Sequence, residues 1–446
     1  MKSNKCSFTG YTLFVSLIAA IGGLLFGYNT SVISGALLVI SEQLKLTILQ
    51  QELVVSILLI GAIFGAAIGG ALADRYGRKI MLIITAFLFI ISTCYLTITS
   101  TFIGLLIGRV IGGIAIGIAS LVVPLYIAEM SAPQSRGALV SLNQLAITIG
   151  ILLAYGIDYV FASQNGWRSM FGFGLFPAAL FFLGLFFIPE TPSFLSRVGK
   201  KHKALEIFKK ISTSKIQSDL LDVDGAKTGT WANVFSKAVR PALIVGVLIS
   251  IFQQITGINT VIYYAPRIFQ LAGLQSASSA ILATFGVGVV NVLLTIVALW
   301  LIDRAGRRRL LIIGISGMIA SLVLLGFAFI GAIPSLGIVA VLSLMCYVAF
   351  FAISLGPVAW LIISEIYPLE VRGKAMSIAT FANWGCNFIV SLTFLSLIEW
   401  LGSAGAFWLY AAIAMLALWF VMVKVPETKG QTLSKIQEFW KKHYSK

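Results

Sequence analysis

The sequence predicts an all-α membrane protein with twelve transmembrane helices, arranged as two six-helix bundles joined by a short cytoplasmic helical linker. Three observations support this fold class. Only 11% of the 446 residues are charged and 59% are hydrophobic, whereas a soluble chain needs charged residues to cover its surface. Apolar runs of about twenty residues recur, and each can cross a hydrocarbon core of roughly 30 Å as a helix. Three short motifs also occur twice, in the same order.

The apolar runs give the boundaries of the predicted helices. The first run is longer than the apolar region of a signal peptide and is followed by eleven more, so we expect it to be retained. The predicted spans are 11–39, 52–73, 80–99, 102–128, 138–161, 168–188, 239–270, 277–302, 309–332, 336–364, 374–398 and 404–424. The predicted organisation is a bundle at 1–189, a linker at 190–238, a bundle at 239–425 and a tail at 426–446.

Basic residues lie almost entirely on one side of the predicted helices. With the N-terminus inside, the inner segments hold 28 of the 32 Lys and Arg residues, while Lys45, Arg168 and Arg267 are outside and Arg109 is within a helix. This asymmetry places both termini in the cytoplasm. It explains the net charge of +16 without nucleic acid. We therefore expect a monomer in the cell membrane whose partners are lipid and a small solute.

The repeated motifs indicate an internal duplication. The first copies are Asp74 to Lys79, Glu129 followed by Arg136, and Pro189-Glu190-Thr191. They return at a nearly constant offset as Asp303 to Arg308, Glu365 followed by Arg372, and Pro426-Glu427-Thr428. All copies fall at the inner ends of predicted helices. Parallel six-helix halves are typical of transporters that bind their substrate near the middle of the membrane.

The charged residues of these motifs predict an ion-pair network on the cytoplasmic face, because a carboxylate of one helix accepts a guanidinium from the next. Its expected members are Asp74, Arg75, Arg78, Glu129 and Arg136 in the first half, and Asp303, Arg304, Arg307, Glu365 and Arg372 in the second. We expect the network to stabilise the outward-open state and to part when the inner side opens. The alternative is that these charges only fix the orientation of the helices.

Carboxamide side chains recur within the apolar helices, where they are costly without partners or water. They are Gln144, Gln253, Gln254, Asn259, Asn291, Asn383 and Asn387, and Trp360 and Trp384 lie nearby in the sequence. One amide alone is explained by bonding between helices. Together with aromatic surface they favour a polar cavity for a sugar, which presents hydroxyls and a weakly apolar ring face. Helix breaks at Gly257 and at Gly356-Pro357 would expose backbone groups to this cavity.

The ordered motifs resemble the sugar porter branch of the major facilitator superfamily along essentially the whole chain. The resemblance rests on Gly70-x-x-x-Asp74-Arg75-x-Gly77-Arg78-Lys79, on Pro-Glu-Thr-Pro at 189–192 and on the run from Gln253 to Asn259. Leu299 and Ser193 depart from the family pattern. The resemblance implies that Gln144, Gln253, Gln254, Asn259, Asn291, Trp360, Asn383 and Trp384 bind a hexose. It also implies an outer gate at Tyr263 and Tyr264.

The mode of transport is predicted from Asn29 and Arg109, which lie at matching depths in two helices. In the resembled family, proton-coupled members generally carry aspartate where this chain has Asn29, and an amide does not titrate. Ile151 also stands where a xylose-proton symporter has glutamine. Asp158 and Glu399 are expected to be solvated at outer helix ends. We therefore expect a hexose facilitator that works by alternating access.

Two alternatives to the facilitator remain. The first is a proton-coupled symporter for a hexose, xylose or arabinose, and the second is a membrane sugar sensor, which the short tail disfavours. An enzyme is not expected, because the sequence has no Gly-x-x-x-x-Gly-Lys-Ser/Thr phosphate loop and no catalytic constellation. The four cysteines show no CxxC spacing, and no cofactor or metal is expected. Glycines at Gly61, Gly65, Gly69, Gly104, Gly108 and Gly112 predict close helix packing.

Overall fold

The structure is a computed structural model that describes residues 9–132, 135–164, 166–211, 230–237, 239–331, 335–368, 370–429 and 431, without the side chain of Asp303. Residues 212–229 of the predicted linker lie outside the described residues, as does most of the predicted tail. Regular secondary structure in the described residues is entirely helical. The predicted all-α fold class is confirmed.

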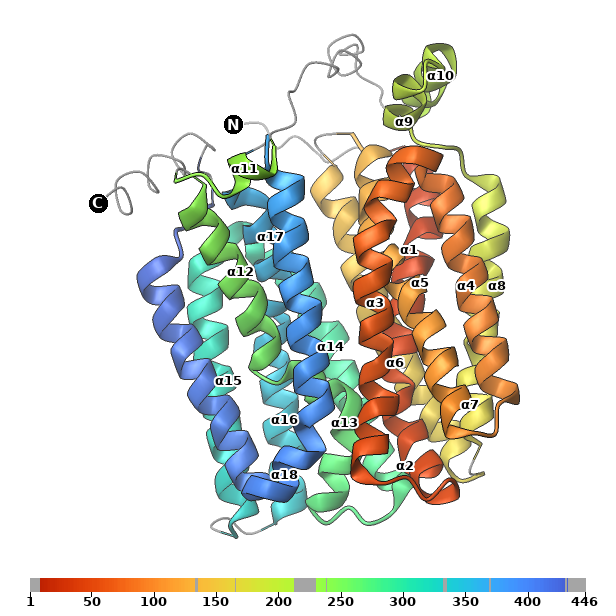
Figure 1. The fold of residues 1–446 in the computed structure, drawn as a ribbon. Coiled ribbons are helices and arrows are strands. Elements are labelled where there is room, and N and C mark those ends of the chain that lie inside the picture. Colours follow the sequence, from red (N-terminus) through yellow and green to blue (C-terminus); the bar gives the residue numbers. More distant parts are fainter. Residues whose placement is uncertain are drawn as a thin grey trace. The chain divides into compact units, whose positions relative to one another are not determined.

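Figure 1 shows the described helices in their order along the chain. They are α1 (Gly10–Ser31), α2 (Ile33–Gln43), α3 (Ile48–Tyr76), α4 (Arg78–Ile98), α5 (Phe102–Glu129), α6 (Arg136–Ala162), α7 (Trp167–Phe173), α8 (Leu175–Gly184), the 3-10 helix η1 (Leu185–Phe187), α9 (Pro192–Arg197), α10 (Lys201–Ile211), α11 (Trp231–Val234), α12 (Arg240–Ile255), α13 (Ile258–Leu271), α14 (Ala277–Ala305), α15 (Arg307–Phe329), α16 (Leu336–Ala352), α17 (Leu355–Ile366) and α18 (Arg372–Lys424).

Eleven segments of the described chain are long and apolar enough to cross a membrane. The last of them, α18, has 53 residues. A straight helix of that length would measure about 80 Å, well beyond the hydrocarbon core. Its backbone leaves the helical region at Gly402, where φ is 72° and ψ is 164°. Figure 1 shows α18 reversing direction, so this one segment supplies two crossings and accounts for the twelve predicted.

The chain forms two compact units that differ from the two sequence halves. The first comprises Met1–Val32, Ile60–Ala154 and Arg168–Ala226, and the second comprises Ile33–Leu59, Tyr155–Trp167 and Lys227–Lys446. Outer helix ends from the first half therefore group with the second half. Hydrogen bonds within the second unit explain this grouping: the Tyr155 hydroxyl donates to the Ile262 carbonyl over 2.8 Å, and the Ser396 N–H donates to Glu52 over 2.7 Å.

Glycines set the packing of α3 against α5 in the first unit. A Cβ atom added at Gly61 would lie 2.3 Å from the Val110 carbonyl oxygen, and one at Gly65 would lie 2.2 Å from that of Ile114. Real Cβ atoms do not approach a backbone oxygen so closely, so a side chain at either position would force the helices apart. The predicted packing role of these two glycines is confirmed.

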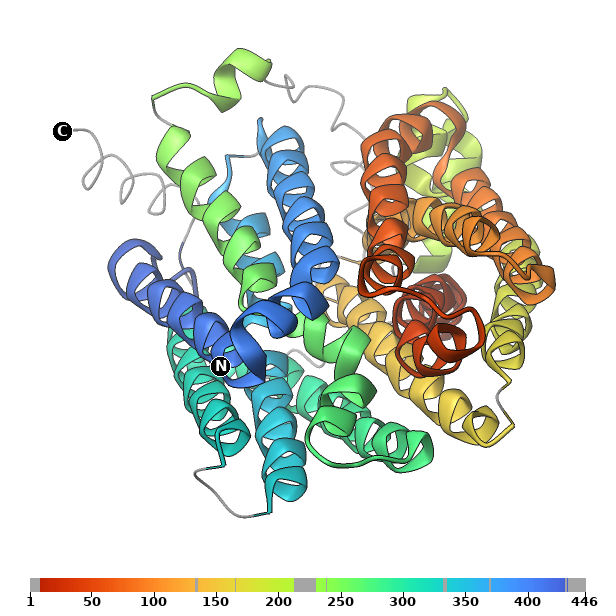
Figure 2. The ribbon, with the colours of Figure 1, turned by 60° about the horizontal axis from the view of Figure 1, so that its bottom comes forward.

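The second unit is built around α18, which packs against α12 and α15 (Figures 1 and 2). The predicted break at Gly257 is confirmed: φ is 95°, and this glycine separates α12 from α13. The break near Gly356-Pro357 lies slightly earlier than predicted, at Ile353 and Ser354. Proline excludes a helical bond to the carbonyl four residues before it, so the irregular residues precede Pro357 while Pro357 itself fits in the first turn of α17.

Candidate functional site

A cluster of carboxamides joins α12, α13 and α18 inside the second unit. Gln253 accepts a hydrogen bond at Oε1 from Asn383 Nδ2 over 2.7 Å. Gln254 donates from Nε2 to Asn383 Oδ1 over 3.0 Å and accepts at Oε1 from Asn259 Nδ2 over 2.5 Å. Gln253, Gln254 and Asn383 are buried, and Asn259 is half-buried. We call these four residues the amide cluster.

The break between α16 and α17 contributes backbone groups to the amide cluster. Gln253 Nε2 donates to the carbonyl oxygens of Leu355 and Gly356 over 2.8 and 3.2 Å. Asn383 Nδ2 also donates to the Ser250 carbonyl over 3.0 Å. The amides therefore satisfy one another and nearby backbone carbonyls. The arrangement presents both donors and acceptors, as recognition of hydroxyl groups requires.

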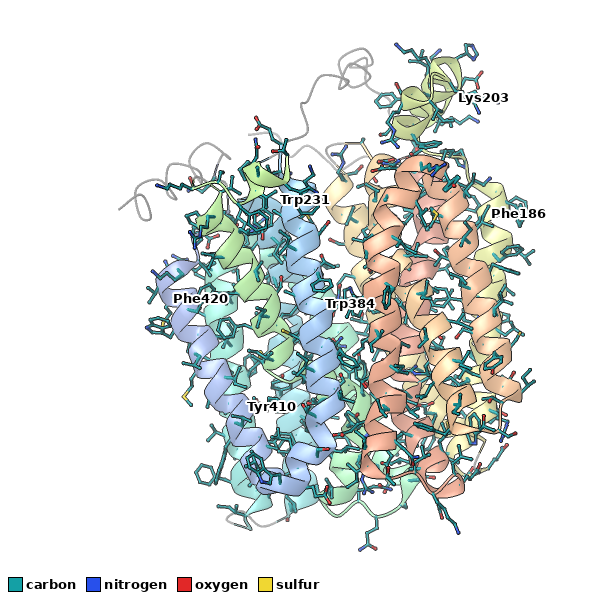
Figure 3. The ribbon with its side chains drawn as sticks, viewed as in Figure 1. Phe186, Lys203, Trp231, Trp384, Tyr410 and Phe420 are labelled. Atoms are coloured by element: carbon teal, nitrogen blue, oxygen red, sulfur yellow. The ribbon has the colours of Figure 1, made fainter. Side chains whose placement is uncertain are left out.

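The other predicted binding residues lie on several helices. Asn291 is buried on α14 and Trp384 is buried on α18, one residue beyond Asn383 (Figure 3). Trp360 is half-buried on α17. Gln144 is half-buried on α6 and belongs to the first unit.

The two tyrosines predicted as an outer gate connect α13 to α18. Tyr263 and Tyr264 are both buried. The Tyr264 hydroxyl donates to the Ser391 carbonyl over 2.8 Å, and Asn387 Nδ2 lies 3.4 Å from the Tyr263 hydroxyl oxygen. Asn387 also accepts from the Ser391 hydroxyl over 3.1 Å. Tyr263 thus contacts α18 about one turn beyond Asn383 of the amide cluster, and Tyr264 contacts it about two turns beyond.

Arg109 and Asn29 meet within the first unit, as their depths in the sequence suggest. Arg109 is only 2% exposed, and its Nη1 donates to the backbone carbonyl of Asn29 over 2.8 Å. The Asn29 side chain donates to the carbonyl of Leu25 in its own helix over 3.0 Å. The contact between the two residues therefore uses the Asn29 backbone, not its carboxamide.

Each half contains an ion-pair group built on its Asp-Arg-x-Gly-Arg motif. Arg78 lies 3.0 Å from both Asp74 and Glu129, which joins the ends of α3, α4 and α5. In the second half, Arg307 lies 3.2 Å from Glu365 and joins α15 to α17. The side chain of Asp303 lies outside the described part of the structure.

Four of the arginines predicted in these networks form no ion pair among the described residues, although Glu365 acts electrostatically on Arg372. Arg75 lies over the Tyr76 ring and Arg304 over the Trp300 ring. Arg136 is exposed, and Arg372 donates to the Tyr367 carbonyl. In the first motif, the chain turns at Gly77, where φ is 104°, between Asp74 in α3 and Arg78 at the start of α4. This turn brings the Arg78 guanidinium to the Asp74 carboxylate, whereas Arg75 lies before the turn.

Glu190 and Glu427 cap the N-termini of α4 and α15, a role that was not predicted from the sequence. Glu190 accepts hydrogen bonds from the backbone N–H groups of Arg78 and Lys79 at the start of α4. Glu427 accepts from those of Arg307 and Arg308 at the start of α15. Both satisfy the unpaired donors of a helix N-terminus. Burial raises the pKa of the Glu190 carboxyl, and these hydrogen bonds oppose that effect. The repetition of the Pro-Glu-Thr motif in both halves was the feature of the sequence that could have indicated this capping role.

A family model described as sugar (and other) transporter matches residues 15–440. The chain belongs to this family. It is therefore a multi-pass membrane sugar transporter and not an enzyme.

Individual relatives cover nearly the whole chain. A D-xylose transporter of Levilactobacillus brevis is 42% identical over 96% of this chain and 95% of its own. The glucose transporter GlcP of Staphylococcus epidermidis is 40% identical over 98% and 97%. The proton:xylose symporter XylE of Escherichia coli, solved with 6-bromo-6-deoxy-D-glucose, is 36% identical with a TM-score of 0.78, covering 96% of this chain and 99% of that one.

In this transporter the Gly77→Ala variant is expected to be about 1–2 kcal/mol less stable, because Gly77 adopts a φ of 104° that disfavours other residues. A Cβ atom there would also lie 2.3 Å from Glu190 Oε2 and displace the cap on α4. Thermal unfolding of purified protein measures the effect. Gly137→Ala is the control, since nothing lies within 4 Å of its added Cβ. Equal unfolding temperatures for the two variants would contradict the capping role.

Proposed function

We propose that this transporter takes up an aldose, either a hexose or a pentose, together with protons across the cell membrane by alternating access. The amide cluster carries the proposal, because four polar side chains lie together in membrane-spanning helices at a point where two helices are broken. Such a costly arrangement is functional by default in a membrane. We assign sugar binding to Gln144, Gln253, Gln254, Asn259, Asn291, Trp360, Asn383 and Trp384.

The relatives support the sugar class and favour proton coupling over the facilitator predicted from the sequence. They include proteins named for xylose and for glucose. XylE is described as a proton:xylose symporter and was solved with a glucose analogue. That protein is thus described with both a pentose and a hexose analogue. We extend this range to the present chain.

The remaining predicted residues fit steps of the transport cycle. Tyr263 and Tyr264 would close the outer side of the site, because they stand beyond the amide cluster on α13. The pairs Arg78–Glu129 and Arg307–Glu365 would hold the inner helix ends in the outward-open state and part when that side opens. Both termini would lie in the cytoplasm.

A hexose facilitator is the second candidate, and one observation favours it. Asn29, which meets Arg109 in the first unit, carries an amide that neither gains nor loses a proton. If no other group in the chain carried a proton through the membrane, sugar would move only down its own gradient.

Uptake of radiolabelled xylose and glucose into proteoliposomes tests the proposal. With an imposed inward proton gradient, sugar is expected to accumulate above the external concentration, and a protonophore is expected to abolish the accumulation. Uptake that stops at the external concentration would establish the facilitator instead. Failure to transport any of a panel of aldoses would overturn the assignment of substrate.

A further inference from the structure

A carboxyl group is buried in the membrane-spanning part of α6. Asp158 is 0% exposed and lies within the candidate span from 136 to 162. The expectation that it is solvated is therefore wrong, whereas Glu399 is exposed as expected. The physical reason is that the last turns of α6 pack against α2 instead of ending in water.

The carboxyl group of Asp158 packs directly against the backbone of α2. Its Oδ2 accepts a hydrogen bond from the N–H of Gly35 over 3.0 Å. A Cβ atom at Gly35 would lie 2.5 Å from Asp158 Cβ and 2.7 Å from its Cγ, so only glycine leaves room for the carboxyl. The Ser34 hydroxyl lies beside it. The other oxygen, Oδ1, is buried and has no hydrogen-bond partner among the described residues.

No charged side chain compensates this carboxyl. Asp158 forms no ion pair within the described part of the chain. Charged groups on the elements around it are Glu42 and Lys45 at the end of α2 and Arg267 on α13, all of them exposed. On α6 itself, Tyr155 donates to Ile262, and Tyr159 is 42% exposed. A buried anion without a counter-ion is strongly disfavoured, so the carboxyl is neutral when it is enclosed in this way.

Glu52, a second buried acid among the described residues of this unit, shows the contrasting case. Its Oε1 accepts from the N–H of Ser396 and its Oε2 from the hydroxyl of the same residue, each over 2.7 Å. Both oxygens are thus satisfied as acceptors, which suits an ionised group. Asp158 accepts a single backbone hydrogen bond, from Gly35, and has only the Ser34 hydroxyl beside it among the described residues, so the two acids are not equivalent.

We propose that Asp158 is the proton-binding group through which this transporter couples sugar to the proton gradient. The inference rests on the proposed symport and supplies the titratable carboxyl that Asn29 lacks. In the outward-open state, the carboxylate takes one proton from the outer aqueous phase. Contacts of α6 with α2 then enclose it as the neutral acid, and the same proton leaves to the cytoplasm after the inner side opens. No other reactant is consumed.

Transport by the Asp158→Asn variant tests this role, because asparagine keeps the shape and the acceptor for the Gly35 N–H but cannot titrate. With a gradient of one pH unit and one proton per sugar, the wild type is expected to accumulate sugar about tenfold. The variant is expected to reach only the external concentration while sugar exchange continues. Glu399→Gln, which neutralises an exposed acid, is the matched control and is expected to accumulate sugar like the wild type.

The outcomes separate this inference from the proposed function. A wild type that only equilibrates sugar would overturn symport and this role together. Accumulation retained in Asp158→Asn would overturn the role of Asp158 alone and leave symport standing. If the variant loses exchange as well, infrared spectroscopy of the purified proteins decides. A carboxylic-acid carbonyl band present in the wild type and missing in the variant supports the proposal, and an unchanged band overturns it.

Discussion

Replacing Gln254 with alanine is expected to weaken sugar binding by about five- to 150-fold. Gln254 lies at the centre of the amide cluster, bonded to both Asn259 and Asn383. Losing a hydrogen-bond partner for a polar ligand costs on the order of 1–3 kcal/mol, which corresponds to this range of affinity. Equilibrium binding of radiolabelled sugar to purified protein measures the change.

Gln270→Ala is the matched control for this experiment. Gln270 is a glutamine at the outer end of α13, where it interacts with the exposed Arg267 and not with the amide cluster. Its replacement is expected to leave the sugar affinity unchanged. The same affinity in Gln254→Ala, with a normal unfolding temperature, would remove the amide cluster from the binding site.

Gly65→Ala is expected to destabilise the first unit by about 3 kcal/mol, at the upper end of the cost of overpacking. The added Cβ would meet the Ile114 carbonyl oxygen at 2.2 Å, and a backbone oxygen in a helix cannot turn aside as a side chain does. Alanine favours helix formation over glycine, so any loss of stability must come from the contact between α3 and α5. A lower unfolding temperature and less folded protein in the membrane are the expected observations.

Gly70→Ala, five residues further along α3, provides the comparison. Nothing lies within 4 Å of a Cβ atom at Gly70, so this variant is expected to be as stable as the wild type or slightly more stable. Equal stability of Gly65→Ala and Gly70→Ala would mean that the two helices can separate at little cost, contrary to the packing described above.

Features that depend on local chemistry were predictable from the sequence. Periodic apolar runs gave the helices, and Gly257 marked a break because its backbone conformation is one that glycine adopts easily. The amides of α12, α13 and α18 could be selected as candidate site residues because burying a polar group in lipid is energetically unfavourable. Their mutual hydrogen bonds were not predictable, since Gln254 and Asn383 are 129 residues apart and only the tertiary fold brings them together.

Features that depend on the surroundings of a side chain were harder to predict. Asp158 lies near a helix end and was expected to be in water, but Gly35 of another helix allows α2 to cover it. Arg136 and Arg372 belong to a duplicated motif, yet the Arg136 side chain is exposed and Arg372 donates to the Tyr367 carbonyl. Sequence spacing indicates which residues share a helix face and does not show what covers that face.

The self-sufficiency of the amide cluster bears on how this transporter would discriminate among sugars. When an analogue lacks a hydroxyl and thereby leaves buried polar groups of the binding site unpaired, the site rejects that analogue strongly. Here Gln253, Gln254, Asn259 and Asn383 already bond to one another without a ligand. When a substrate lacks one hydroxyl, the corresponding amides keep their internal partners, and the penalty is small. Pentoses and deoxyhexoses would then compete with glucose at comparable concentrations, and selectivity would depend on ring shape more than on the number of hydroxyls.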